Sequence, residues 1–278
     1  MTPPAIAAGA TAGTAAGTVP LAASGLVLAY ERTVVVDGLS VEFAPGSITA
    51  LIGPNGCGKS TLLRAFARVL APRAGAVQLG GIPLATLATR EIAKSLSYLP
   101  QTPTAPPGLT VRELVTLGRF PHRRGLGGAT AVDRQAVGHA LAAVGLAGQH
   151  DVDLDQLSGG QRQRAWIGMV LCQEAAVLLL DEPTSHLDPA HQLEVMLLLR
   201  RVAAAGRTVV VVLHDLQLAA RHADRLIALA DGRIAAHGVP SDVITPTVLE
   251  RVFAIRADVI ADPLTGTPIC LPRGLTTG

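Results

Sequence analysis

Short apolar runs alternate with longer amphipathic segments along this 278-residue chain. The runs at residues 48–52, 175–180 and 209–213 are far shorter than the roughly 20 residues that span a bilayer. Such continuous runs are typical of strands that are buried on both faces of a parallel sheet. Between them, apolar residues recur with a helical period, at residues 62–70, 111–117, 133–144 and 162–172. The pattern therefore predicts an α/β fold.

Other stretches alternate apolar and polar positions, as antiparallel strands do. In residues 25–43, Leu26, Leu28 and Tyr30 share one face, and Asp37-Gly38 is predicted to be the turn of a hairpin. A second hairpin is predicted over residues 225–237. These segments predict an antiparallel β layer beside the parallel core.

Composition and proline spacing give the domain plan. Residues 1–24 carry no charge and are rich in Ala, Gly, Thr and Pro, which predicts a disordered tail rather than a secretory signal. One domain is expected over residues 25–273, with a tail at 274–278. The proline-rich residues 102–108 predict a hinge into a mainly helical subdomain over about residues 102–172. Three cysteines without framework spacing suggest reduced thiols in the cytosol.

The stretch Gly53-Pro54-Asn55-Gly56-Cys57-Gly58-Lys59-Ser60-Thr61 fits the phosphate-loop pattern G-x-x-x-x-G-K-[ST]. It stands between a predicted strand and a predicted helix, as the pattern requires. Its glycines would let backbone N–H groups surround phosphate oxygens at a helix N-terminus. Lys59 is expected to reach the β- and γ-phosphates, and Ser60 to ligate Mg²⁺. The alternative is a glycine-rich turn that holds a lysine by chance.

A second anion site is predicted at Leu157-Ser158-Gly159-Gly160-Gln161, just before the amphipathic segment 162–172. A serine hydroxyl and free backbone N–H groups at a helix N-terminus favour an anion. One chain with two phosphate-type sites either binds two anions, or contributes each site to a partner's.

Polar side chains follow two of the predicted core strands. Asp181 and Glu182 follow the apolar run that ends at residue 180, and a buried carboxylate there needs a cation. Asp181 is expected to share Mg²⁺ with Ser60, and Glu182 to accept a proton from an attacking water, a role worth ~10²–10⁴ in rate. His214 follows the next strand, at the sheet edge where ligands bind, although a capped strand end is the alternative.

Two further features leave two interpretations each. Tyr30, upstream of the phosphate loop, either stacks on a nucleobase or is a half-buried strand residue. The basic cluster of Arg119, His122, Arg123 and Arg124 is either a solvated loop, which we favour, or a surface that faces a membrane partner and anionic lipid.

The motifs, in their order along the chain, resemble the nucleotide-binding subunit of ABC (ATP-binding cassette) transporters over residues 26–273. The motifs that carry this resemblance are the phosphate loop, Gln101, residues 157–161, residues 177–182, Asp188 and His214. Residues 118–122, 162–167, 190–192, 214–216 and 262–268 further resemble the ATPases of iron-siderophore importers, a group that includes haem and cobalamin uptake.

The resemblance implies a P-loop NTPase fold of the ABC type, with a RecA-like core, an antiparallel β layer and a helical signature subdomain. It also implies ATP and Mg²⁺ as cofactors. The roles that it implies are adenine stacking for Tyr30, a link from Mg²⁺ and water to the helical subdomain for Gln101, and γ-phosphate contacts for His214. Ser158, Gly159, Gly160 and Gln161 would contact the ATP held by a second copy, and Asp188 would cross that interface.

The expected function is hydrolysis of ATP to power import of a ferric-siderophore-type chelate. Two copies would sandwich two ATP at the cytoplasmic face of the cell membrane, on separate permease subunits fed by a substrate-binding protein. Haem or cobalamin import is the alternative within the family. A soluble ABC ATPase acting on nucleic acid, ribosomes or iron-sulfur assembly is the alternative from another class. A net charge of +2 gives little support for a nucleic acid partner.

Overall fold

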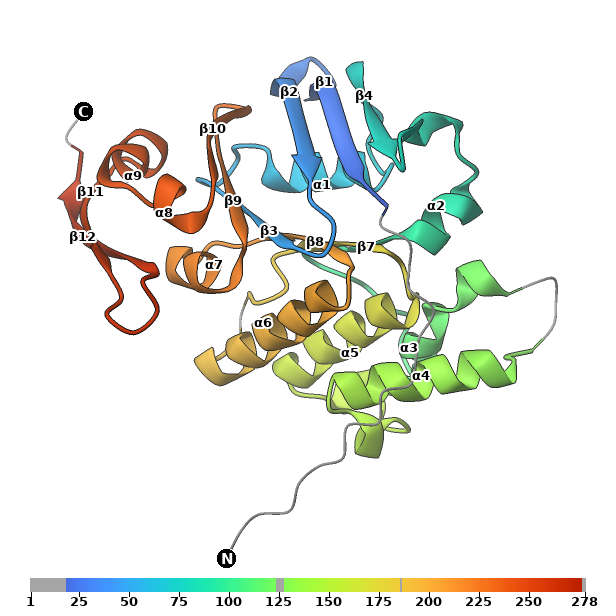
Figure 1. Ribbon diagram of the computed structural model, residues 1–278. Coiled ribbons are helices and arrows are strands. Elements are labelled where there is room, and N and C mark those ends of the chain that lie inside the picture. The colour runs from blue at the N-terminus through green and yellow to red at the C-terminus, as the bar shows by residue number, and fades with distance from the viewer. Residues whose placement is uncertain (1–18, 124–127, 186, 277–278) are drawn as a thin grey trace, which may run out of the picture.

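The computed structural model describes residues 19–123, 128–185 and 187–276. Its centre is a six-stranded sheet of order β10-β9-β3-β8-β7-β6 (Figure 1). The paired strands are parallel except for the β9–β10 hairpin at one edge, so the predicted α/β core and this hairpin are confirmed. The strands are β3 (Ile48–Ile52), β6 (Leu96–Leu99), β7 (Val177–Asp181), β8 (Thr208–Val212), β9 (Arg225–Ala230) and β10 (Arg233–Gly238).

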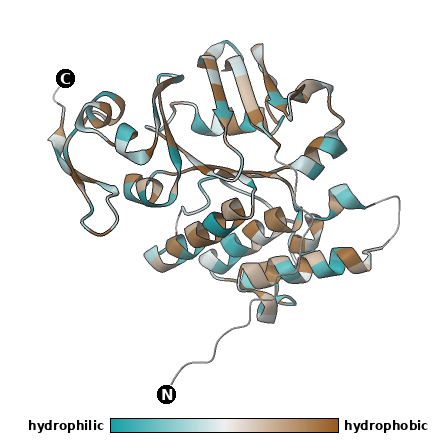
Figure 2. Cartoon of the chain, in the orientation of Figure 1, coloured by the Kyte–Doolittle hydropathy of each residue, from teal (hydrophilic) through white to brown (hydrophobic). Residues whose placement is uncertain are grey.

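The core strands are apolar because they are covered on both sides. Every residue of β3, β7 and β8 is buried, and hydrophobic residues predominate along these strands in Figure 2. One face of the sheet packs against α1 (Lys59–Phe66), which separates it from a second, antiparallel sheet. The second sheet has the order β2-β1-β4-β5, with β1 (Leu21–Tyr30), β2 (Thr33–Phe43), β4 (Ala74–Leu79) and β5 (Ile82–Pro83).

The opposite face of the central sheet is covered by helices, and α4, α5 and α6 run side by side below it in Figure 1. The predicted boundaries of a helical subdomain at 102–172 remain a prediction, since α3, α4 and α5 share one continuous core with the sheet. The remaining helices and strands are α2 (Thr89–Ser95), α3 (Val111–Leu117), α4 (Ala131–Ala143), α5 (Gly159–Cys172), α6 (Pro189–Ala204), α7 (Leu216–His222), α8 (Pro240–Val243), α9 (Pro246–Phe253), β11 (Ile255–Ala261) and β12 (Pro268–Leu275).

Two predicted boundaries and one predicted turn are wrong. Residues 21–24, predicted as tail, begin β1 and pair with both β2 and β4, while residues 1–18 of that tail lie outside the described residues. At the other end, β12 continues to Leu275. The first hairpin turns at Glu31 and Arg32, not at Asp37-Gly38. Gly38 instead lies inside β2, where its positive φ (66°) accompanies a shift in the register of pairing with β1.

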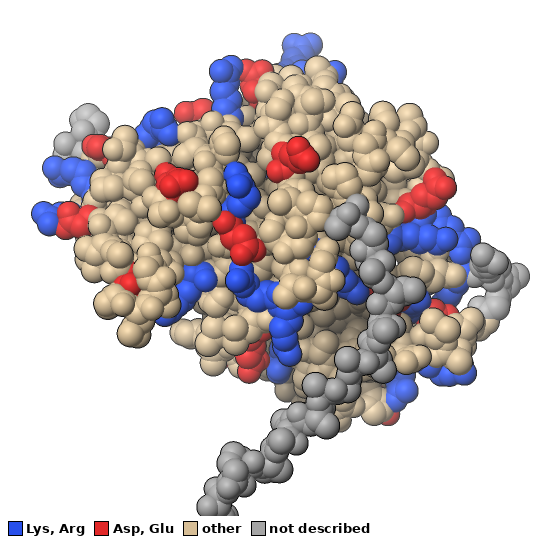
Figure 3. All heavy atoms as spheres, in the orientation of Figure 1, with Lys and Arg blue, Asp and Glu red and all other residues tan. Residues whose placement is uncertain are grey.

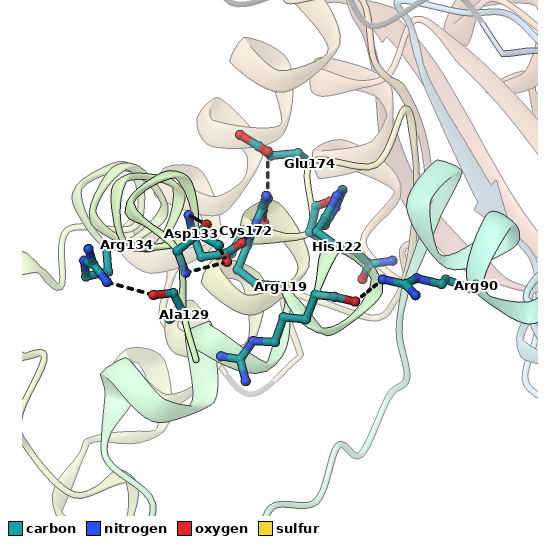
Figure 4. Close-up of polar contacts among 11 residues, drawn as sticks. Arg90, Arg119, His122, Ala129, Asp133, Arg134, Cys172 and Glu174 are labelled. Carbon is teal, nitrogen blue, oxygen red and sulfur yellow. Dashed lines mark hydrogen bonds and ion pairs between the residues drawn. The ribbon is translucent and has the colours of Figure 1, made fainter. Parts of the chain in front are cut away.

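One residue of the basic cluster, Arg119, is not on the surface as both interpretations required. Arg119 is only 3% exposed and joins three helices (Figure 4). Its guanidinium donates to Asp133 at the start of α4 (3.0 Å), and to the Cys172 carbonyl (2.9 Å) and Glu174 (2.7 Å) at the end of α5. His122, half-buried, lies 2.8 Å from the Gln173 carbonyl oxygen. Arg124 lies outside the described residues.

On the face that Figure 3 shows, acidic and basic side chains are interspersed, in keeping with the small net charge. Within residues 19–123, 128–185 and 187–276, no helix is both long enough and apolar enough to cross a membrane.

Candidate functional site

The predicted phosphate loop connects β3 to α1, and its backbone requires glycine. Gly53 has a φ of 147° and Gly58 a φ of 103°, values that other residues rarely adopt. A Cβ atom at Gly53 would also lie 2.3 Å from the carbonyl oxygen of Leu229, so no side chain fits there. Glycine loops of this kind at a helix N-terminus expose successive N–H groups to one anion.

The Lys59 side chain lies against this loop. Its ammonium donates to the carbonyl oxygens of Gly53 and Pro54, both at 2.8 Å, and lies 3.8 Å from the Cys57 sulfur. Lys59 is buried, so its positive charge is screened less than it would be in water. Burial raises the pKa of the Cys57 thiol, which keeps that cysteine protonated beside the ammonium.

Asp181, at the end of β7, faces Ser60 at the start of α1. The Ser60 hydroxyl donates to Asp181 Oδ1 at 2.9 Å. Asp181 is 1% exposed, and among the described residues its Oδ2 has no hydrogen-bond partner. Burial raises the pKa of this carboxyl. A buried carboxylate with one free oxygen, next to a hydroxyl, supplies the hard oxygen ligands that Mg²⁺ prefers, so the two residues fit this ion.

Glu182 follows directly but has different partners. Its Oε1 lies 2.6 Å from His214 Nε2, and its Oε2 accepts a hydrogen bond from the Ser185 hydroxyl at 2.9 Å. Burial acts to raise the pKa of Glu182, but hydrogen bonds from His214, Ser185 and Gln101 hold it below its usual value. The carboxylate is therefore ionised and held in place at neutral pH.

Lys59, Ser60, Glu182 and His214 line one cleft of about 640 Å³, and Asp181 is joined to it through its hydrogen bond with Ser60. Nine of its ten lining residues are site residues predicted from the sequence, and Ser185 is the tenth. The cleft thus has the phosphate loop with Lys59 on one wall and a carboxylate–histidine pair on the other. The full lining is Asn55, Gly56, Gly58, Lys59, Ser60, Thr61, Gln101, Glu182, Ser185 and His214.

Other predicted site residues do not line this cleft. Ser158 caps α5, where its hydroxyl accepts from the Gln161 N–H at 3.3 Å. Asp188 caps α6 and accepts from His191, whose ring would contact a Cβ atom added at Gly160 at 3.4 Å. The starts of α5 and α6 therefore lie together, and neither is among the residues that line the cleft.

Tyr30 also lies outside the cleft lining, at the end of β1. It is 41% exposed, and its hydroxyl accepts a hydrogen bond from Arg64 Nη1 at 3.2 Å. Sequence reasoning missed Arg64 and Ser185. Their spacing could have found them, because Arg64 lies four residues after Ser60 on one helix face, and Ser185 three residues after Glu182.

Comparisons with known proteins agree with this geometry. Residues 36–185 match the family model described as ABC transporter. The probable siderophore transport system ATP-binding protein YusV of Bacillus subtilis (strain 168) is 50% identical over 250 residues, 90% of this chain and 91% of that protein. The ferric enterobactin transport ATP-binding protein FepC of Escherichia coli (strain K12) is 45% identical over 252 residues, 90% of this chain and 93% of that protein.

Solved structures are similar over most of the chain. The dimeric structure of a bacterial ABC transporter cassette is 28% identical, with a TM-score of 0.71 over 79% of this chain and 98% of that one. An inward-facing ABC transporter described as being of the metal-chelate type is 26% identical, with a TM-score of 0.79 over 92% of this chain and 98% of that one. These matches confirm the predicted fold class, and the chain belongs to the ABC transporter family.

Proposed function

We propose that this chain is the ATP-hydrolysing subunit that powers import of a ferric-siderophore-type iron chelate through a separate membrane permease. The observation that carries the hydrolysis is the cleft that Lys59, Ser60, Glu182 and His214 line, with Asp181 hydrogen-bonded to Ser60 and Glu182 paired with His214. The chelate rests on the printed names of the relatives, such as the siderophore and enterobactin proteins above.

The site residues divide into binding and chemistry. Residues 53–61 and Lys59 hold the triphosphate, and Tyr30 stacks on the adenine. Ser60 and Asp181, with Gln101, would hold Mg²⁺, which neutralises phosphate charge when bound. Glu182 accepts the proton of the attacking water at a carboxylate that is already ionised. His214 turns from Glu182 to the γ-phosphate when ATP is present.

The second anion site belongs to a second copy of this chain. Ser158, Gly159, Gly160 and Gln161 contact the ATP that the other copy holds, and Asp188 crosses the interface. This arrangement accounts for two predicted anion sites that lie apart in one chain, and it has the two-fold symmetry that favours closed dimers. The dimeric cassette structure among the neighbours supports it.

Closure of this dimer is the step that ATP drives. The γ-phosphate gains contacts from both copies only in the closed dimer, so ATP stabilises that state and hydrolysis releases it. Gln101 follows β6, before the proline-rich residues 102–108, and transmits the change to a permease at the cytoplasmic face of the membrane. A substrate-binding protein delivers the chelate on the other side.

A Glu182→Gln variant tests the chemistry. It should bind ATP, lose hydrolysis and persist as a closed dimer by size-exclusion chromatography with light scattering. A monomer under saturating ATP and Mg²⁺ would contradict the proposal.

The transport role is tested by purifying the tagged chain from detergent-solubilised native membranes. A polytopic permease should co-purify, and its binding protein should take up ferric chelates. Haem is the second candidate cargo, because the hemin import ATP-binding protein HmuV of Bordetella pertussis (strain Tohama I / ATCC BAA-589 / NCTC 13251) is 43% identical over 263 residues, 91% of this chain and 99% of that protein. Recovery of ribosomes or nucleic acid without a permease would refute the transport role.

A further inference from the structure

The turn after β7 places two consecutive carboxylates in different surroundings. Asp181 ends the strand, and Glu182 has a φ of 52°, a left-handed conformation that costs free energy for any residue other than glycine. Strained backbone of this kind persists where neighbouring contacts hold it. The residue that holds it here is Ser185.

Ser185 contacts Glu182 twice. Its backbone N–H donates to the Glu182 carbonyl oxygen at 3.2 Å, which closes the turn. Its hydroxyl donates to Glu182 Oε2 at 2.9 Å. The first bond needs only a backbone and would form with almost any residue at this position. The second bond needs a hydroxyl of the right length, so the side chain of Ser185 serves the carboxylate and not the turn.

The two oxygens of the Glu182 carboxylate therefore have different neighbours. Oε2 is held by a residue of the same short turn, only three positions away. Oε1 is 2.6 Å from His214, whose side chain is 44% exposed whereas that of Glu182 is 10% exposed. Oε1 thus lies beside the more accessible partner, which can turn away, while Oε2 stays fixed by the turn.

We propose that Ser185 is a positioning residue for the hydrolysis step: its hydroxyl fixes Oε2 of Glu182, so that Oε1 is the oxygen that takes the proton from the attacking water. One O–H bond of the water breaks, the proton goes to Oε1, and the water oxygen bonds to the γ-phosphorus as the bond to the ADP oxygen breaks. This inference rests on the proposed ATP hydrolysis. In this role Ser185 acts through Glu182, and not on the water or the nucleotide.

Three variants at this position separate the hydroxyl from the turn. Ser185→Ala and Ser185→Cys keep the backbone bond but remove the strong donor, and cysteine also keeps the approximate size. Ser185→Thr keeps the hydroxyl. Ser47→Ala is the matched control, because the Ser47 hydroxyl also donates to a residue three positions earlier, the Ala44 carbonyl at 2.6 Å, in a turn outside the cleft lining.

Steady-state Mg²⁺-dependent ATP hydrolysis by the full chain is the assay. Ser185→Ala and Ser185→Cys should each lower kcat about tenfold, roughly the effect of losing one hydrogen bond to a charged group. KM for ATP should stay within about twofold, because the hydroxyl positions the base and does not bind substrate. Ser185→Thr should recover most of kcat, and Ser47→Ala should match the wild type.

A wild-type kcat for both Ser185→Ala and Ser185→Cys overturns the inference. So does a KM that rises in step with the loss of kcat, or a Ser185→Thr variant as slow as Ser185→Ala, since either outcome indicates a structural role. If Ser185→Ala does not fold, Ser185→Cys and Ser185→Thr still decide it. Failure of the proposed function is distinct, because the wild type itself would then not hydrolyse ATP, or Glu182→Gln would hydrolyse it normally.

Discussion

Replacing Asp133 with asparagine tests the buried ion pair that joins α3, α4 and α5. Arg119 and Asp133 have side chains only 4% and 5% exposed, and Arg119 Nε lies 3.0 Å from Asp133 Oδ1. The other oxygen, Oδ2, accepts from the Thr130 N–H at 3.0 Å and the Thr130 hydroxyl at 2.8 Å. Asparagine keeps the shape but turns one acceptor into an NH₂ donor, which must face either Arg119 or Thr130.

The size of the effect follows from the carboxyl group. Hydrogen bonds from Thr130 and Arg119 lower the pKa of Asp133 from 3.8 to about 2, a shift equivalent to about 2 kcal/mol of folding free energy. Breaking a buried pair from one side typically costs about 3–5 kcal/mol. We therefore expect Asp133→Asn to lower the free energy of unfolding by about 2–4 kcal/mol at pH 7.

The sign of the pH dependence is fixed by the lowered pKa. The contribution of Asp133 is fully present above the unfolded value of 3.8 and is lost as the pH falls towards 2. Urea unfolding followed by circular dichroism should thus give the same wild-type–variant gap at pH 7 and pH 5. Asp151→Asn is the control, because Arg112 and Asp151 form a 3.2 Å pair with side chains 53% and 76% exposed, worth about 0–1 kcal/mol. A gap of less than about 1 kcal/mol for Asp133→Asn, or one that closes by pH 5, would refute the argument.

Three more variants probe the site and the packing. Asp181→Asn should raise the Mg²⁺ concentration needed for ATP hydrolysis at least tenfold, and an unchanged Mg²⁺ titration would count against this ligand. Tyr30→Ala should weaken ATP binding about tenfold, whereas Tyr30→Phe should bind ATP like the wild type, because stacking needs the ring. If both variants lose the same affinity for ATP, the hydroxyl and not the ring is the group that matters. Gly118→Ala should lower stability by about 1–3 kcal/mol, because a Cβ there would lie 2.2 Å from the α5 backbone. Gly138→Ala is the control, because a Cβ there would meet no described atom within 4 Å. Equal melting temperatures for the two variants would contradict the predicted clash at Gly118.

The central sheet was predictable because its signal is local. Strands buried on both faces are mainly apolar, and residues 48–52, 177–181 and 208–212 are apolar except for Thr49, Asp181 and Thr208. The first hairpin was not predictable in detail. Asp37-Gly38 is a common turn pair, but the turn formed at residues 31–32, and the glycine was used for a bulge inside β2. Tertiary pairing of β1 with both β2 and β4 decides between these uses.

Burial of charge was likewise beyond the sequence. The basic residues from Arg119 onward suggested a solvated or lipid-facing surface, yet Arg119 is among the buried residues because its partners come from α4 and from the end of α5. Those partners lie 14 and 55 residues away in the chain. No periodicity or composition connects them.

The cleft shows why the site was predicted better than its surroundings. Parallel strands deliver their carboxyl-terminal residues to one edge, so Asp181 and His214 were expected near the phosphate loop, and the resemblance to the family added Gln101. The sequence does not predict the φ of 52° at Glu182. In this conformation the Glu182 side chain contacts Ser185 and His214, whereas Asp181 contacts Ser60.

The pKa values of Asp181 and Glu182 shift in opposite directions because the two carboxyl groups have different hydrogen-bond partners. Burial raises the pKa of Asp181, which has one hydroxyl partner and one free oxygen. Glu182 is also penalised by burial, but its hydrogen-bond partners lower its pKa. Environments that move two adjacent carboxyls apart are the usual basis for giving them separate roles. We therefore propose that a cation stabilises Asp181, the carboxylate with fewer hydrogen-bond donors, and that Glu182, which hydrogen bonds keep ionised, acts as the base.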